Sequence, residues 1–330
     1  MRLIQFVTEA GQRRVGAILE DGADPVVVSG AAAVRDLALE AYRRGVTLRE
    51  IIEAHGFGEP VDYDALLREK RLLPPLDHPE PSRMLISLTG LTHLGSAQTR
   101  DAMHAGQEEE ALTDSMKMFK WGIEGGKPSA GAIGVQPEWA YKGDGSWVVA
   151  PEHPLELPGY AWDGGEEAEI AGLYVIGDNG EVLRVGFALG NEYSDHVMER
   201  KNYLYLAHSK LRQCSFGPEL LVGELPAEVP ILVSIIREGK VIWSAECFSG
   251  EQHMCHSLSN LEHHHFKYAN FRRPGDVHVH FFGASALSFS SNVKVAPGDV
   301  FHISSPVFGR PLRNPVVAGP KEDLISVIAL

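Results

Sequence analysis

Two carboxylates at the start of an apolar run could bind a divalent cation. Glu167 and Glu169 are one residue apart, and residues i and i+2 of a strand point to the same face. Two carboxylates side by side on a mostly apolar strand repel each other, and burial strengthens that repulsion. A divalent cation removes the conflict, and ligation by oxygen alone favours Mg²⁺ or Mn²⁺ over Zn²⁺. The alternative is an exposed strand end with both charges in water.

A third carboxylate is available where the partner strand is expected to end. Glu192 follows the strand that returns beside Glu167 and Glu169, so it can complete the cation site, and Asp195 is the competing candidate. His196 has a side chain that commonly binds zinc, but one histidine does not make a zinc site. For Asp195 and His196 the plainer interpretation is hydrogen bonding within a loop.

Lys210 is the candidate base. It follows the aromatic-rich run 203–209, which reads YLYLAHS. Apolar surroundings and a nearby cation both disfavour the charged form of a lysine, so Lys210 could accept a proton near neutral pH. The alternative is a surface lysine whose aliphatic stem covers apolar surface.

The elements that must position these residues are mostly strands. A hairpin is predicted for 169–176 and 182–189, joined at Asn179-Gly180, a dipeptide typical of tight turns. The spacing of Met254, Leu258 and Leu261 predicts a helix over 251–268. The glycines and prolines of 128–145 predict a loop. Further strands are predicted at 84–88, 231–236, 240–245, 277–282 and 300–303.

The first 80 residues are predicted to form a separate small α+β domain. Short β-type runs at 3–7, 14–19 and 25–28 precede helical patterns at 31–44 and 62–73. A proline-rich linker follows, ending at Pro81. The chain is therefore divided into 1–80 and a β-rich domain at 81–330, with a mixed α+β architecture rather than a doubly wound sheet.

Composition limits the class of partner and the compartment. The chain has 330 residues and a formal net charge of −14, which argues against nucleic acid or an anionic membrane surface as partner. Three cysteines without a CxxC pair fit a reducing compartment. No apolar run is long enough to span a membrane, and no signal peptide is recognised, so we expect a cytoplasmic protein.

Three further groups of residues could be functional or structural: an acidic segment, a run of three histidines and two cysteines. The acidic segment 99–115 is either a solvated face or a lid. His263, His264 and His265 are adjacent in a predicted helix, where neighbours face different ways, so we interpret them as a surface feature. Cys247 and Cys255 are interpreted as core thiols.

The chain resembles the fumarylacetoacetate hydrolase superfamily from about Arg83 to Leu330. That superfamily presents two glutamates one residue apart on a strand, matched by Glu167 and Glu169, and a third acidic ligand in an Asn-Asp-x-Ser motif. Here Glu192 replaces the aspartate of that motif. The match continues through Lys210 and later pieces of the sequence: Gly217-Pro218, Pro297-Gly298-Asp299 and Asn314-Pro315-Val316. The resemblance implies a mixed β-sheet roll preceded by a small N-terminal domain.

Within the superfamily, the chain is similar to the branch that dehydrates 2-keto-3-deoxy pentonates. Ser96 and Arg100 match a Ser-x-x-x-Arg element of that branch, and 204–210 matches its Tyr-Leu run ending in a catalytic lysine. A Gly-Thr pair of the branch appears here as Gly283-Ala284-Ser285, which shifts the hydroxyl by one position. The resemblance implies substrate binding by Ser96 and Arg100, with Lys120 as a further candidate, and catalytic roles for Lys210 and Ser285.

The function implied is a Mg²⁺- or Mn²⁺-dependent dehydratase acting on a small 2-keto acid. It would convert a 2-keto-3-deoxy pentonate into 2,5-dioxopentanoate through a metal-stabilised enolate, in non-phosphorylative pentose catabolism, and the resemblance implies a homodimer. One alternative is a hydrolase that cleaves a carbon–carbon bond in a 2,4-diketo acid of the acylpyruvate or fumarylacetoacetate type. Another is a non-catalytic protein that binds keto acids or sugars.

Overall fold

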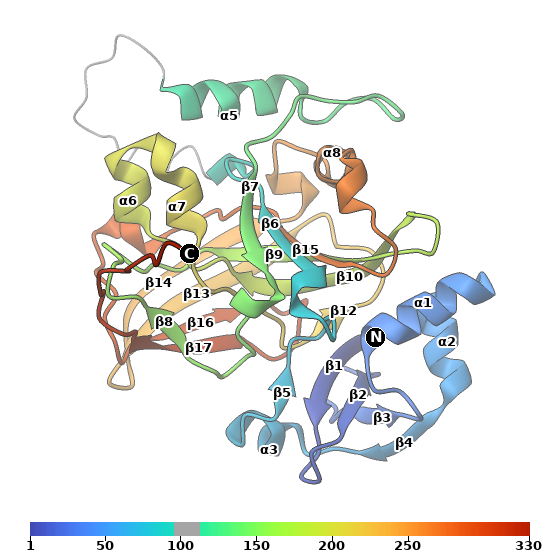
Figure 1. Cartoon of the computed structure of the whole chain (residues 1–330). Helices are drawn as coiled ribbons and strands as arrows, with labels where there is room; N and C mark the ends of the chain where they lie inside the picture. The colour runs from blue at the N-terminus through green and yellow to red at the C-terminus, as the bar shows by residue number, and fades with distance from the viewer. Residues whose placement is uncertain (96–112) are drawn as a thin grey trace.

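The computed structural model describes residues 1–95 and 113–330. Ser96, Arg100 and the larger part of the predicted lid lie outside these residues. Within them, the chain forms two β-sheets with helices at their periphery (Figure 1). The predicted mixed α+β architecture is confirmed. No helix among the described residues is long and apolar enough to cross a membrane.

The larger sheet has twelve strands in the described part of the chain and runs through both predicted domains. Its strands are antiparallel neighbours except for β15 and β6, which are parallel. Two short strands, β5 (Leu72–Leu73) and β11 (Ser215–Phe216), pair with β1 and β10 outside the main order. In spatial order the others are β4 (Phe57–Pro60), β3 (Val26–Val28), β2 (Arg13–Ile18), β1 (Arg2–Val7), β12 (Leu220–Leu221), β10 (Val182–Asn191), β9 (Ala168–Ile176), β15 (Val277–Phe281), β6 (Met84–Leu88) and β7 (Ala140–Asp144).

The smaller sheet packs against the larger one across a shared apolar layer. Ile170 of β9 and Phe187 of β10 lie in one buried cluster with Val233 of β13. The smaller sheet has five strands among the described residues, in the order β14 (Lys240–Ser249), β13 (Val229–Arg237), β16 (Val300–Ser304), β17 (Leu312–Ala318) and β8 (Leu155–Leu157).

Both faces of β9 are covered, and this decides where its carboxylates lie. Even-numbered Ile170 faces the second sheet. Odd-numbered Leu173 and Val175 face the main core, which also receives helix α1 of the N-terminal part. Because side chains alternate along a strand, Glu167 and Glu169 share the face of Leu173. All nine residues of β9 are buried.

The helices are short and lie around the sheets (Figure 1). Thr47 and Glu50 form a capping box at the start of α2, which explains why that helix begins there. The helices are α1 (Val34–Arg44), α2 (Leu48–His55), α3 (Tyr63–Arg68), α5 (Asp114–Gly125), α6 (His196–Lys201), α7 (Leu206–Lys210) and α8 (Leu258–Phe266).

Three element predictions need correction. The predicted loop 128–145 contains β7, which forms because the edge of β6 is open to pairing. The predicted helix 251–268 reduces to α8 after a single 3₁₀ turn at Glu251–His253. The predicted helix 62–73 ends at Arg68, and its last two residues form β5.

Residues 1–80 are joined to the rest of the chain by backbone pairing. Strand β1 pairs with β12, so Arg2 lies opposite Leu221. Arg2 is also bound to Glu219 through its guanidinium. The division at residue 80 stays a prediction, but the two parts share one sheet and one apolar core.

Candidate active site

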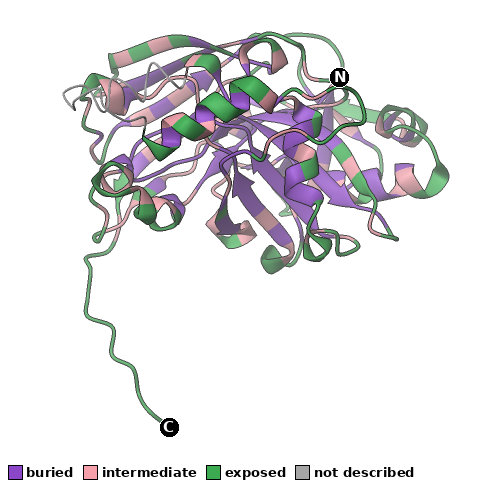
Figure 2. Cartoon of the chain, turned by 90° about the horizontal axis from the view of Figure 1, so that it is seen from above, coloured by how far each residue is buried: buried purple, intermediate pink, exposed green. Residues whose placement is uncertain are grey.

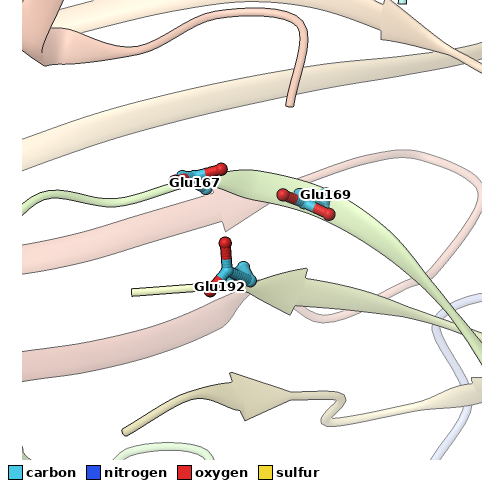
Figure 3. Close-up of side chains that lie close together, drawn as sticks. All are labelled: Glu167, Glu169 and Glu192. Atoms are coloured by element: carbon cyan, nitrogen blue, oxygen red, sulfur yellow. The ribbon is translucent and has the colours of Figure 1, made fainter. Parts of the chain in front are cut away.

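Three glutamates converge at the ends of β9 and β10 (Figure 3). Glu167, Glu169 and Glu192 each offer a carboxylate oxygen, and these oxygens lie within 4.8 Å of one another. All three side chains are buried. The structure therefore brings together the three residues that the sequence predicted as metal ligands, and they form the only such group among the described residues.

The β9–β10 hairpin accounts for this convergence. In its register Gly190 lies opposite Glu169, and Asn191 opposite Ala168. The ladder continues past the strand, because the amide of Glu192 donates to the carbonyl of Glu167 at 3.0 Å. Glu192 thus returns beside the pair with its side chain turned toward them (Figure 3).

Among the described residues, no cation forms an ion pair with the carboxylate of Glu169. Its Oε2 accepts a hydrogen bond from the amide of Gly283 at 2.6 Å, and no donor among the described residues reaches its buried Oε1. Burial raises the pKa of Glu169 well above its ordinary value, and the charges of Glu167 and Glu192 raise it further. Three convergent carboxylates with one oxygen left over fit Mg²⁺ or Mn²⁺, which prefer oxygen ligands.

Lys210, the last residue of α7, lies against these carboxylates. Its Nζ contacts Glu167 and lies 3.1 Å from Oε2 of Glu192 and 3.6 Å from Oε2 of Glu199. Burial acts to lower the pKa of Lys210, but the negative charges of Glu167, Glu192 and Glu199 prevail and raise it well above its ordinary value. The predicted apolar surroundings are therefore wrong: Lys210 is buried as an ammonium among acidic groups.

A second buried lysine was missed from the sequence. Lys142 of β7 is fully buried, and its Nζ donates to Oε1 of Glu192 and to the carbonyls of Tyr193 and Lys210 at 2.7 and 2.9 Å. It was overlooked because its segment was predicted as a loop. The signal that could have revealed it is the alternation of a strand: Ala140 and Lys142 lie on the buried face, and Tyr141 between them lies on the exposed face.

Asp195 and His196 are held by contacts other than those expected of a third metal ligand. His196 lies with Nε2 3.1 Å from Oε1 of Glu167. Burial acts to lower the pKa of His196, but the hydrogen bond to Glu167 and the charges of Glu167 and Glu199 together outweigh burial and raise it. Asp195 caps α6, accepts from the amide of Trp162 at 2.9 Å and pairs with Arg212 at 2.8 Å. Its oxygens do not belong to the converging group of ligand atoms, which favours Glu192 as the third ligand.

The loop after β15 is tied to the same acidic stretch at two points. The Gly283 amide binds Glu169, and Ser288 donates from its amide and hydroxyl to Glu166 at 2.8 and 2.7 Å. Ser285 lies between these anchors and is half-buried. A Cβ on Gly95 would come within 2.6 Å of the Ser285 hydroxyl. The loop therefore packs directly on the chain that leads to Ser96.

The remaining predicted substrate residue lies on the surface. The Lys120 side chain is 62% exposed on α5, and its Nζ lies 3.8 Å from Glu124 one turn later. Its assignment to the substrate site stays a prediction, as do those of Ser96 and Arg100, which the described residues do not include.

The histidine triplet does not lie wholly on the surface. His263 is exposed, but His264 and His265 are buried. His265 contacts two histidines of β15: its Nε2 lies 2.9 Å from Nδ1 of His278, and its ring centroid lies 4.6 Å from that of His280. The surface interpretation is wrong for both buried residues: His265 packs on β15, and Nε2 of His264 lies 3.0 Å from the carbonyl of Gly134.

Comparison with known proteins bears on the fold of the chain. No protein-family profile matches the chain. One curated relative, a probable 2-keto-3-deoxyxylonate dehydratase from Haloferax volcanii, is 32% identical over 114 residues. The match covers 33% of this chain and 37% of that relative's length.

Solved structures match over almost the whole chain. The apo form of 2-keto-3-deoxy-D-arabinonate dehydratase aligns with a TM-score of 0.70 at 19% identity, covering 97% of this chain and 100% of that one. The same dehydratase complexed with magnesium and 2,5-dioxopentanoate aligns with a TM-score of 0.70 at 18% identity, covering 98% of this chain and 100% of that one. A 5-carboxymethyl-2-hydroxymuconate delta-isomerase from Mycobacterium smegmatis aligns with a TM-score of 0.56 at 18% identity, covering 96% of this chain and 100% of that one. At these identities the matches establish the fold, and the expected fumarylacetoacetate hydrolase-like fold is confirmed.

Proposed function

We propose that this chain is a Mg²⁺-dependent dehydratase that converts a 2-keto-3-deoxy pentonate into 2,5-dioxopentanoate. The observation that carries the proposal is the buried triad of Glu167, Glu169 and Glu192 beside Lys210, with Oε1 of Glu169 left without a donor among the described residues. The substrate follows from the relatives: a structural neighbour is a dehydratase complexed with magnesium and 2,5-dioxopentanoate, and the Haloferax relative is a probable dehydratase of the same substrate class.

Glu167, Glu169 and Glu192 would hold the cation, with Mn²⁺ as the alternative to Mg²⁺. When bound there, Mg²⁺ supplies Lewis acidity that stabilises the enolate of a 2-keto acid. Lys142 contributes by holding Oε1 of Glu192, which leaves Oε2 of that residue facing Lys210. The length of Glu192, compared with an aspartate, lets one carboxylate serve both lysines.

Lys210 is proposed to exchange the C3 proton at its Nζ. Its ammonium is 3.2 Å from the hydroxyl of Ser194 and within reach of the carboxylates, so its position is fixed by several contacts. Lys210 stays protonated because the carboxylates attract its ammonium. A cation bound to the same oxygens would weaken that attraction, so Lys210 could then both accept and donate a proton.

Loss of the C4 hydroxyl requires groups beyond the triad. Ser285 is proposed to assist this step, because its loop is anchored through Gly283 to a residue of the triad. Ser96 and Arg100 are proposed to hold the anionic or hydroxyl end of the substrate, since arginine suits carboxylate recognition. Lys120 is the third proposed substrate residue. Loss of the C3 proton and the C4 hydroxyl leaves a double bond between C3 and C4. Removal of a proton from C5 and return of a proton to C3 then give the enol at C4–C5, which tautomerises to the aldehyde.

We further propose a cytoplasmic homodimer that takes part in non-phosphorylative pentose catabolism. The three cysteines, Cys214, Cys247 and Cys255, are free and buried, which agrees with a reducing compartment.

The test is a substrate panel with Mg²⁺ and after chelation. Formation of an aldehyde from a 2-keto-3-deoxy pentonate without loss of carbon, dependent on the metal, supports the dehydratase. Pyruvate release indicates carbon–carbon cleavage, so it would replace the dehydratase by the hydrolase. Intact Mg²⁺ binding without turnover of either substrate class would leave a binding protein.

A further inference from the structure

Residues 320–330 leave the body of the protein as an extended arm (Figure 2). The base of the arm is fixed, because the amide of Gly159 donates to the carbonyl of Pro320 at 3.0 Å. Farther along, its large apolar side chains project into water. The exposed fractions of Leu324, Ile325, Val327 and Ile328 lie between 82% and 96%.

The sequence of the arm is that of a buried strand. From Leu324 it reads LISVIAL, and only Ser326 is polar. In an extended chain Leu324 and Ile328 face one side, while Ile325 and Val327 face the other. Branched residues favour strands, and a strand that is apolar on both faces is normally covered on both. The surface of its own subunit could cover only one face of the arm, so a second copy is needed to cover the other.

An exposed apolar surface lies next to the base of the arm. The loop that carries Tyr160 is joined to α7 through Arg212. The guanidinium of Arg212 lies over the Tyr160 ring at 5.1 Å, donates to the carbonyl of His208 in α7 at 3.2 Å and pairs with Asp195. The rings of Trp162 and Tyr205 meet edge to face at 6.3 Å, and Leu204 is 84% exposed. We call this surface the aromatic patch: Tyr160, Trp162, Leu204 and Tyr205.

The charges of the arm and of the patch are complementary. Just before its apolar part the arm carries Lys321, Glu322 and Asp323, so the two acidic residues leave it a net negative charge. The patch is flanked by Arg200 and Lys201, which are exposed in the last turn of α6. Opposite charges at the rim of an apolar contact fix its register and disfavour other partners.

We propose that the arm of one copy covers the aromatic patch of a second copy, and that the second arm covers the first patch. The arm base and the patch are neighbours within one copy, since Tyr160 directly follows Gly159. A single two-fold axis near the arm base therefore satisfies both contacts. Tyr205 immediately precedes α7, which ends at Lys210. The arm of one copy thus supports the helix that positions the proposed base of the other.

Light scattering during gel filtration tests the proposal on the full chain. We expect the full chain to elute at twice 36.1 kDa. Deletion of residues 320–330, Ile328→Asp and Leu204→Asp should each weaken self-association by roughly tenfold or more. Val241→Asp is the matched control, because Val241 is 61% exposed on β14, outside the patch, and should leave the dimer intact. A monomeric full chain, or a dimer broken by Val241→Asp but not by Leu204→Asp, overturns the proposal.

Cross-linking distinguishes exchange between copies from folding back on the same copy. Leu204→Cys and Ile328→Cys are prepared separately and mixed, and the native cysteines give no background because all three are buried. A short bismaleimide should then produce a linked pair of chains in the mixture. If the doubly substituted chain becomes linked only within itself, and the mixture gives no linked pair, the arm covers its own subunit and the proposal fails.

Discussion

Two buried polar clusters lie on neighbouring strands of one sheet: the carboxylates of the candidate active site, and the histidines of β15 that α8 covers. Glu169 is on β9, while His278 and His280 are on β15, which pairs with β9. Burial lowers the pKa of His278 to about 4 and that of His280 to about 3. These histidines are therefore neutral at pH 7, whereas the acidic cluster holds two buried lysines and a carboxylate oxygen without a donor among the described residues.

The difference shows which buried polar cluster is a candidate site. The histidines remove their charge by losing a proton, and they then pack as aromatic rings. A glutamate removes its charge by gaining a proton instead. Burial acts to raise the pKa of Glu167, but the Lys210 charge and the contacts with His196 prevail and hold it well below its ordinary value, so this carboxylate stays charged. The ligand atoms of the three glutamates also converge within 4.8 Å, and no histidine group in the described residues does the same. The candidate site is therefore identified by carboxylates that converge without full balance of their charge, and not by burial alone.

The largest expected effect is that of Glu169→Gln. The variant should lose metal-dependent turnover by roughly 10³-fold or more, because Lewis-acid stabilisation contributes several kcal/mol. The melting temperature of its metal-free form should also rise. The folded protein raises the pKa of Glu169, so the parent protein loses stability as the pH increases from the ordinary pKa toward the raised one. Glutamine stays neutral and avoids this loss. Turnover and metal-free melting curves check both. Full activity of the variant would show that Glu169 is not a metal ligand.

Lys210→Met should reduce turnover by roughly 10²–10⁴-fold, the range expected for loss of a positioned acid or base. Proton exchange at C3, followed by NMR in deuterated water, should disappear, while calorimetry should still detect Mg²⁺ binding to the three glutamates. Retained exchange at C3 would rule out Lys210 as the base.

Lys142→Met should destabilise the metal-free protein by about 3–5 kcal/mol, because it removes the buried cation that holds Oε1 of Glu192 and leaves only Lys210, which Glu192 shares with Glu167. Mg²⁺ should restore more stability to this variant than to the parent protein, and chemical denaturation with and without Mg²⁺ measures the difference. Lys120→Met is the control, since Lys120 is an exposed lysine on α5 and should not change stability. A lowered affinity for substrate in that control would support the predicted binding role of Lys120.

The smallest expected effect comes from the histidine cluster. Because the pKa of His280 is lowered to about 3, its contribution to stability is lost as the pH falls below the ordinary value of 6.5 toward 3. His280→Gln should therefore flatten the loss of stability between pH 6.5 and pH 5 by up to about 1.4 kcal/mol per pH unit. An unchanged slope would show that His280 is not buried in its neutral form. Turnover at pH 7 should be unaffected.

The sequence could predict the triad because its geometry follows from local rules. The alternation of a strand places Glu167 and Glu169 on one face, and the Asn179-Gly180 turn returns Glu192 beside them. The fold class was predictable for the same reason, since most strands were recognised from their own composition.

The residues that the sequence missed depend on distant partners. Lys142 lies in a five-residue strand with weak propensity of its own, and that strand exists because it pairs with β6. His265 is buried because its helix face meets His278 and His280 of β15, which no helical pattern reveals. The charge state of Lys210 likewise follows from three carboxylates, of which the nearest in sequence, Glu199, is eleven positions away. Ser285, Ser96, Arg100 and Lys120 remain predictions.

The pairing of β1 with β12 has a consequence for the order of folding. Arg2 pairs with Leu221 across the sheet, so the part of β1 at Arg2 and Leu3, which β5 does not reach, stays unpaired on that edge until β12 has been synthesised. Contacts of such long sequence separation slow folding, and an unpaired edge can associate with other chains in the meantime. Nascent chains arrested before residue 220 should therefore aggregate more readily than chains arrested after it.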